Sequence, residues 1–159
     1  MKKPALVKKI IQQLGAELAV YHKAARAAHA EATHEQSKAE NKYDTRGLEA
    51  SYLARGQSKQ AAEIVQAIEQ FEKLQLRVFG ENDAVELSAL VELEGKNERS
   101  FYFIGPRAGG TEIVHEKKEV LVITPQSPLG QQLVGKKQNE RLKIEIGGSR
   151  NDYRVISVS

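Results

Sequence analysis

The sequence predicts an α+β protein in which an N-terminal antiparallel coiled-coil hairpin precedes a small antiparallel β domain with one short helix. The first observation is a seven-residue apolar repeat in the N-terminal half, which is typical of a helix packed on a partner helix. The second is a change of the apolar period to two after about residue 79, which is typical of strands. The third is the charged stretch HEQSKAENKYD at 34–44, between two helical patterns. Together they predict two domains, 1–78 and 79–159.

The first predicted helix follows an apolar stripe with alternating steps of four and three residues. Its members are Val7, Ile11, Leu14, Leu18, Tyr21, Ala25, Ala28 and Ala32. The side chains shrink to alanine toward 34–44, so a partner helix can approach closely there. We therefore expect the hairpin to narrow toward its tip.

A second helical stripe predicts the partner helix. It contains Ala54, Ala61, Ile64, Ile68 and Phe71, flanked by Leu48, Tyr52 and Val65. Two such helices joined by a short polar turn form an antiparallel hairpin. Helices of roughly 30 residues, at about 1.5 Å of rise per residue, extend roughly 45 Å.

The C-terminal half predicts five short strands and one helix. The strand patterns lie in AVELSALVEL, RSFYFIGP, KKEVLVITP, RLKIEIGG and DYRVISVS, with polar or glycine-containing turns between them. In SPLGQQLVG, Ser127 is placed to cap a helix, Pro128 occupies its first position and Gly135 stops it. The domain boundary is expected between Phe79 and Asp83.

Composition excludes several classes of function. The absence of cysteine excludes disulfides and thiolate chemistry, and the four histidines have no metal-ligand spacing, so any metal would be held mainly by oxygen. Lysines interrupt the apolar N-terminal stretch and no run of 18 apolar residues occurs, so we expect a cytoplasmic protein without a membrane segment. A net charge of +3 is far from the basic excess of a free-standing DNA-binding domain.

Three segments resemble the Gre transcription elongation factors of bacteria (GreA/GreB-like). SPLGQQLVGKK at 127–137 is similar to a short helix and turn of that family, and VFG at 78–80 is similar to its interdomain entry. AEN at 39–41 lies where the family carries its tip signature. The resemblance implies a helical hairpin followed by an FKBP-like C-terminal domain.

The resemblance also implies a function in transcription elongation. Gre factors bind RNA polymerase through the C-terminal domain, insert the hairpin into the secondary channel and bring tip carboxylates beside the catalytic magnesium. They stimulate the polymerase's own cleavage of the backtracked RNA 3′ end, so this chain would not itself be an enzyme or hold a cofactor. Its expected partners are RNA polymerase and the nascent RNA 3′ end, and the resemblance implies DNA binding and a monomer. The partner-binding residues would be Ser127, Pro128, Leu129, Gly130 and Lys136.

The tip departs from the family signature of an aspartate, two residues, then glutamate and asparagine. The matching positions hold Ser37, Glu40 and Asn41, so the aspartate is replaced by a neutral hydroxyl that is a poor magnesium ligand. Asp44 follows Glu40 by four residues and shares its helix face if the second helix starts at Ser37. We therefore expect Glu40, Asp44 and Glu35 to be the tip acids that assist the polymerase, with Glu40 and Asp44 as ligands of a shared Mg²⁺.

Other interpretations of the sequence stay open. Ser37 and Glu40 also fit a capping box, in which both side chains serve only the start of the second helix. The protein could then be a non-cleaving secondary-channel regulator or inhibitor with a degenerate tip. Two further alternatives are a prolyl isomerase, disfavoured by the few aromatic residues of the C-terminal half, and a coiled-coil adaptor unrelated to polymerase.

Overall fold

The computed structural model describes residues 1–33, 46–146 and 148–159, and the side-chain surroundings of 1–31, 54–145 and 148–159. The chain forms two compact units, which are described separately. The hairpin unit comprises 12–68, and the sheet unit comprises 1–11 together with 69–159. The boundary expected at 78/79 falls inside the sheet unit; as a division between domains it stays a prediction.

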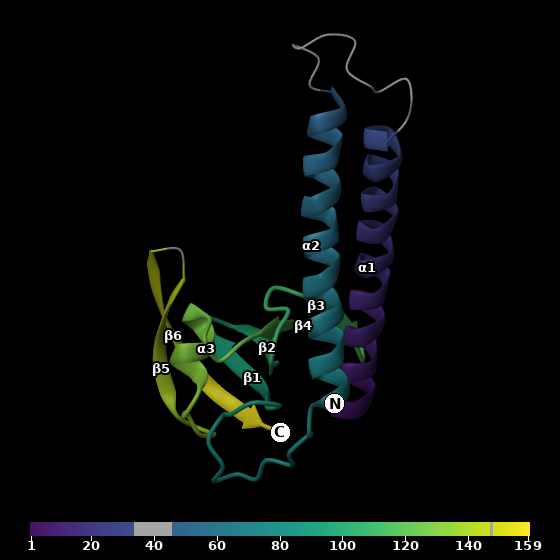
Figure 1. The fold of residues 1–159 in the computed structure, drawn as a ribbon. Helices are drawn as coiled ribbons and strands as arrows, with labels where there is room; N and C mark the ends of the chain where they lie inside the picture. Colours follow the sequence, from purple (N-terminus) through teal and green to yellow (C-terminus); the bar gives the residue numbers. More distant parts are fainter. Residues whose placement is uncertain (34–45, 147) are drawn as a thin grey trace. The chain divides into compact units, whose positions relative to one another are not determined.

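Two long helices form the hairpin, α1 (Lys3–Thr33) and α2 (Arg46–Lys73), as Figure 1 shows. In the hairpin unit, Leu18, Tyr21, Ile64 and Ile68 of the predicted stripe are half-buried, whereas Leu14, Ala25, Ala28, Ala54 and Ala61 are buried. Four of these five residues are alanines, whose small side chains let two backbones approach closely. These alanines therefore support the expected narrowing of the hairpin within the described residues. The tip at 34–44 lies outside them. No described helix is long and apolar enough to cross a membrane.

The sheet unit contains six strands and the short helix α3. Their bounds are β1 (Leu90–Gly95), β2 (Glu98–Ile104), β3 (Glu112–His115), β4 (Lys118–Ile123), α3 (Pro128–Leu133), β5 (Arg141–Ile146) and β6 (Ser149–Val158). The strand order is β3-β4-β2-β1-β6-β5. The α+β class, the hairpin and the short helix are confirmed, while the sheet is mixed because β2 and β4 pair in parallel.

The parallel pair arises from β3, a strand of four residues that the sequence did not reveal. β3 runs antiparallel to β4 and forms the outer edge, so the chain enters β4 in the same direction as β2. Both β1–β2 and β3–β4 are joined by two residues with positive φ, Lys96–Asn97 and Glu116–Lys117. Two left-handed residues form the turn whose twist matches paired antiparallel strands.

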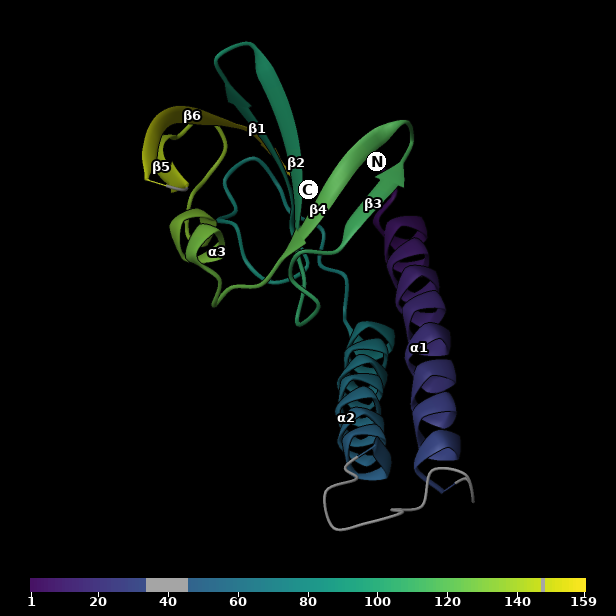
Figure 2. The ribbon, with the colours of Figure 1, turned by 90° about the horizontal axis from the view of Figure 1, so that it is seen from above.

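The core of the sheet unit lies between the sheet and α3. It includes Val91, Leu93, Ile104, Leu133, Ile144 and Val155, with Tyr102 and Tyr153 packed against it. At the β3–β4 side, Leu6 and Ile10 of α1 are fully buried, and Lys9 Nζ donates a hydrogen bond to Val114 O at 3.2 Å. Figure 2 shows the start of α1 beside β3. Leu6 and Ile10 each precede a residue of the predicted stripe. They are buried because the first turns of α1 pack within the sheet unit.

Lys3 connects three distant parts of the sheet unit. Its ammonium group donates hydrogen bonds to the backbone oxygens of Arg77, of Ser88 at 2.9 Å and of Ser159 at 3.1 Å. It also lies 4.8 Å from the ring centre of Phe79, within cation–π range. Burial lowers the pKa of the Lys3 amine below its ordinary value. The VFG stretch therefore has a structural role at Phe79.

We predict that Lys3→Met destabilises the sheet unit by about 1–2 kcal/mol, because three carbonyl oxygens lose a charged donor while the aliphatic part is retained. Urea unfolding followed by tyrosine fluorescence measures this change. Lys2→Met is the matched control, because Lys2 is exposed. Equal stability of both variants would show that the Lys3 contacts add nothing.

His115 is buried on β3 without a hydrogen-bond partner on either ring nitrogen among the described residues. Its side chain is 5% exposed, and Nε2 lies 3.9 Å from Glu116 Oε1, which is longer than a hydrogen bond. An unpaired buried polar group lowers stability. We predict that His115→Leu raises the free energy of unfolding by about 1 kcal/mol. His22→Leu, at an exposed position, should change it little, and a loss of stability in His115→Leu would contradict the prediction.

Candidate functional site

The predicted tip acids cannot be placed in this structure. Glu35, Glu40 and Asp44 lie outside the described residues, as does Ser37. Their roles as catalytic helpers and as ligands of a shared Mg²⁺ stay predictions. Within the described ranges, no group of three or more His, Asp or Glu side chains is arranged to hold a metal ion.

The predicted partner-binding segment begins with the cap of α3. Ser127 has extended backbone angles, φ −66° and ψ 156°, and its Oγ accepts a hydrogen bond from Gly130 N at 3.0 Å. The same hydroxyl donates to Thr124 O at 2.7 Å. Pro128 follows in the first turn, where its missing N–H leaves no bond unmade. The cap and the start of the helix are therefore confirmed as the sequence predicted.

Gly130 is buried where α3 crosses the residues before it. A Cβ atom at this position would lie 1.8 Å from Thr124 O and 2.9 Å from Ser127 Oγ. Only glycine fits so close to a backbone oxygen. Leu129 is half-buried and packs against the core, beside the fully buried Leu133.

The predicted partner-binding residues thus divide into two groups. Ser127, Leu129 and Gly130 have roles inside the sheet unit, whereas Pro128 is exposed and Lys136 is half-buried. The backbone of Lys136 accepts a hydrogen bond from Val85 N at 2.8 Å, so its position is held. Partner binding by this segment stays a prediction, and Pro128 is the one exposed residue of the five.

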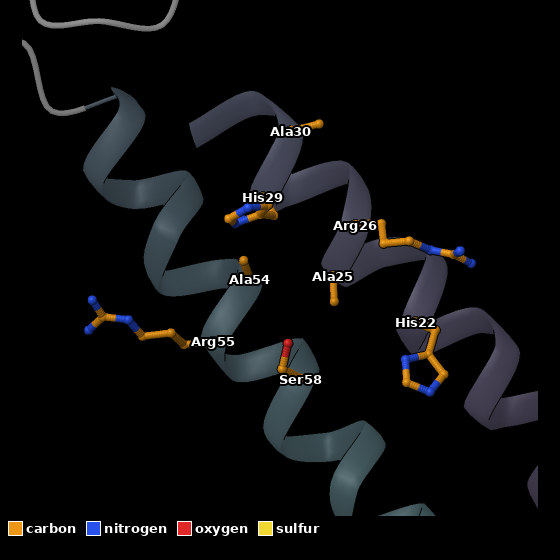
Figure 3. Close-up of a pocket in the computed structure, with 8 residues that line it drawn as sticks. All are labelled: His22, Ala25, Arg26, His29, Ala30, Ala54, Arg55 and Ser58. Carbon is orange, nitrogen blue, oxygen red and sulfur yellow. The ribbon is translucent and has the colours of Figure 1, made fainter. Parts of the chain in front are cut away.

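A groove in the hairpin unit was not predicted from the sequence. It has a volume of about 870 Å³ and is lined by His22, Ala25, Arg26, His29, Ala30, Ala54, Arg55 and Ser58. The buried Ala25 and Ala54 form part of its wall, so it exists because small residues face each other here. In Figure 3 the guanidinium groups of Arg26 and Arg55 point away from one another. The groove therefore has basic margins rather than a convergent anion site.

The sequence indicates only part of this groove. In the sequence, Arg26 lies with Lys8, Lys9 and Lys23 along the first helix, and such charged helix faces are usually only solvated. The sequence does not indicate that one groove contains His22, His29, Arg55 and Ser58. These residues lie on two helices whose register the sequence does not determine. The signal that could have found them is the alanine pair in the two stripes.

Comparisons with known proteins give a structural result only. No family model matches the sequence. No curated protein matches it either. Among solved structures, GreA factor homolog 1 (Gfh1) of Thermus thermophilus aligns at 19% identity and a TM-score of 0.39, covering 94% of each chain.

Two further solved structures align in the same way. Another structure of the transcription factor Gfh1 aligns at 21% identity and a TM-score of 0.41, over 95% of this chain and 94% of that one. A prokaryotic transcription elongation factor GreA/GreB from Nitrosomonas europaea aligns at 17% identity and a TM-score of 0.36, over 70% and 88%. The chain thus aligns over most of its length with Gfh1 and GreA/GreB transcription factors, at low sequence identity.

Proposed function

We propose that this protein is a transcription factor that binds RNA polymerase and inserts its helical hairpin into the secondary channel. The observation that carries this proposal is the described hairpin itself, whose two long helices meet along buried alanines. A hairpin with small side chains at its contact is slender, as entry into a narrow channel requires. The motif resemblance at 78–80 and 127–137 supports the same assignment.

The groove supports contact with an anionic surface along the hairpin. His22, Arg26, His29 and Arg55 belong to its lining, and His22, Arg26 and Arg55 are exposed. Basic side chains attract RNA phosphates through a salt-dependent interaction. This contact would position the hairpin without supplying chemistry.

The chemistry depends on the tip acids. Hydrolysis of a phosphodiester by two metal ions needs the second ion held near the first and a water oriented for in-line attack. Magnesium in such sites is held by one or two carboxylates together with substrate phosphate. Glu40 and Asp44 would supply the carboxylates and the polymerase the remainder, so the cleavage activity would be the polymerase's own.

A non-cleaving regulator is the second candidate, and Ser37 favours it. This hydroxyl stands where the signature has an aspartate, and with Glu40 it fits a capping box. In this case the hairpin occupies the channel and changes polymerase behaviour without bringing a metal. The two candidates share the binding mode and differ only in what the tip does.

An assay on a backtracked elongation complex tests the proposal. RNA labelled at the 3′ end is followed for release of its short 3′ fragment, with and without the protein. For the cleaving factor we predict that Glu40→Ala with Asp44→Ala reduces the acceleration by about 100-fold or more, as for removal of groups that act directly in a reaction. Glu63→Ala with Glu69→Ala is the matched control, because it removes two exposed acids of α2 that are distant in the chain from the tip.

Each result has a distinct meaning. Acceleration lost only in the tip variant supports a cleaving factor. No acceleration, together with competition against an authentic cleavage factor for polymerase, supports the channel-occupying regulator. A protein that neither accelerates cleavage nor binds polymerase would contradict both candidates.

A further inference from the structure

The outer face of the sheet unit carries a row of charged residues across four strands. In the strand register, Arg99 of β2 lies directly opposite Glu94 of β1. Glu94 lies opposite Arg154 of β6, and Arg154 lies opposite Arg141 of β5. Directly opposite residues in adjacent strands project on the same face of a sheet. The four side chains, here called the arginine row, therefore form one line with charges in the order plus, minus, plus, plus.

The arginine row is accessible and incompletely neutralised. The side chains of Arg99, Glu94 and Arg154 are 60%, 40% and 46% exposed, and Arg141 is exposed. Arg154 Nη2 lies 3.5 Å from Glu94 Oε2, whereas Arg141 has no ion pair within the described part of the chain. Like charges directly opposite in a sheet are destabilising. The Arg141–Arg154 pair thus lowers stability unless an external anion lies between the two side chains.

A shallow hollow lies beside Arg154 and Arg141 of the arginine row. It has a volume of about 280 Å³, and its lining is Glu94, Gly95, Lys96, Asn97, Arg141, Asp152, Tyr153 and Arg154. Gly95 approaches the Tyr153 ring so closely that a Cβ atom would lie 2.6 Å from it. The Tyr153 ring therefore covers Gly95 on the face of the sheet opposite to the Arg154 side chain.

We propose that the arginine row is a docking surface for an acidic helix of a partner protein. Strands in a sheet are about 4.8 Å apart, which is close to the rise of about 5.4 Å for one helical turn. A helix lying across the strands would thus place one side chain per turn over each position of the row. The complementary pattern is an acid at i, a base at i+4 and acids at i+7 and i+11.

The acids on this face favour a protein partner over a nucleic acid. Glu92 is bonded to Arg99 at 3.1 Å, and Glu94 lies inside the row. Asp152 stands directly opposite Lys143 in the β5–β6 register, on the same face as Arg141 and Arg154. A phosphate backbone presents negative charge without interruption and would meet these carboxylates, whereas a helix can place a lysine over Glu94. This proposal concerns the sheet unit alone and does not depend on the hairpin entering a channel.

The first probe is an alanine-based helical peptide of about 16 residues with the complementary pattern. It is titrated at low salt into the isotope-labelled full chain, and backbone amide shifts are followed by NMR. We expect the largest shift changes at Glu94, Arg99, Arg141 and Arg154. A peptide of the same composition in scrambled order should bind about tenfold more weakly, because it cannot form the pairs together.

Charge reversal provides the decisive comparison. Arg141→Glu with Arg154→Glu should weaken the first peptide about tenfold and strengthen a peptide with lysine at i+7 and i+11. Lys23→Glu with Lys59→Glu is the matched control, since it changes net charge equally at exposed positions of the hairpin unit. Arg141→Glu alone should raise the melting temperature, because it places opposite charges across β5 and β6. The single variant thus tests the row in a chain that is at least as stable as the parent.

Several outcomes would overturn the proposal. These are a peptide that produces no shifts at the row, a scrambled peptide that binds equally well, or a control pair that weakens binding as much as the row variants. A single-stranded oligonucleotide that shifts the same residues at lower concentration than the peptide would assign the surface to nucleic acid instead.

Discussion

Replacing Gly130 by alanine is expected to lower the free energy of unfolding by about 3 kcal/mol. The added Cβ would lie 1.8 Å from the Thr124 backbone oxygen, which is not the end of a flexible side chain and cannot rotate away. Either α3 or the segment before it must then move, and overpacking of this kind destabilises by about 1–3 kcal/mol and occasionally more. Movement of α3 also disturbs the Ser127 cap and the burial of Leu133.

Urea unfolding followed by tyrosine fluorescence measures the effect. The chain has no tryptophan and five tyrosines, of which Tyr102 and Tyr153 pack against the core of the sheet unit, so part of the emission reports that unit. Gly56→Ala is the matched control, because no atom lies within 4 Å of a Cβ at that helical position. It should stabilise the protein by up to about 1 kcal/mol, since alanine favours helix. A Gly130→Ala variant as stable as the parent would show that the close approach of α3 is absent in solution.

Phe71→Ala has the largest expected effect on stability, about 3–5 kcal/mol, the usual range for a buried phenylalanine. Phe71 is 1% exposed at the end of α2. A Cβ atom at Gly105 would lie 2.9 Å from the Phe71 ring and also close to Val122. The ring therefore fills the space beside Gly105. Truncation removes the ring and leaves a cavity that neither the sheet nor the helix can fill completely.

The same unfolding experiment measures this loss. Val65→Ala is the control on the same helix, because Val65 is 37% exposed and should lose less than about 1 kcal/mol. Gly105→Ala should also destabilise, since its Cβ would lie 2.9 Å from the Phe71 ring. A small loss in Phe71→Ala would mean that α2 is not packed against the sheet at this residue.

The candidate site was only partly predictable from the sequence. Ser127 and Pro128 were recognised as a helix start because capping depends on neighbours in the chain. The close contact between Gly130 and Thr124 involves atoms brought together by a turn, so this packing role was not predicted, and partner binding by the segment stays a prediction. The tip acids were proposed from the motif resemblance, and the described residues do not include them.

The fold shows the same division between local and distant information. By itself the sequence determined the two helices, most of the strands and the start of α3, because apolar periodicity and capping act within a few residues. Only the tertiary structure decided that β2 and β4 run in parallel, that Leu6 and Ile10 are buried and that three arginines lie in one row. These features depend on which distant segments become neighbours, and a side chain's polarity does not specify the strand or helix that it will meet.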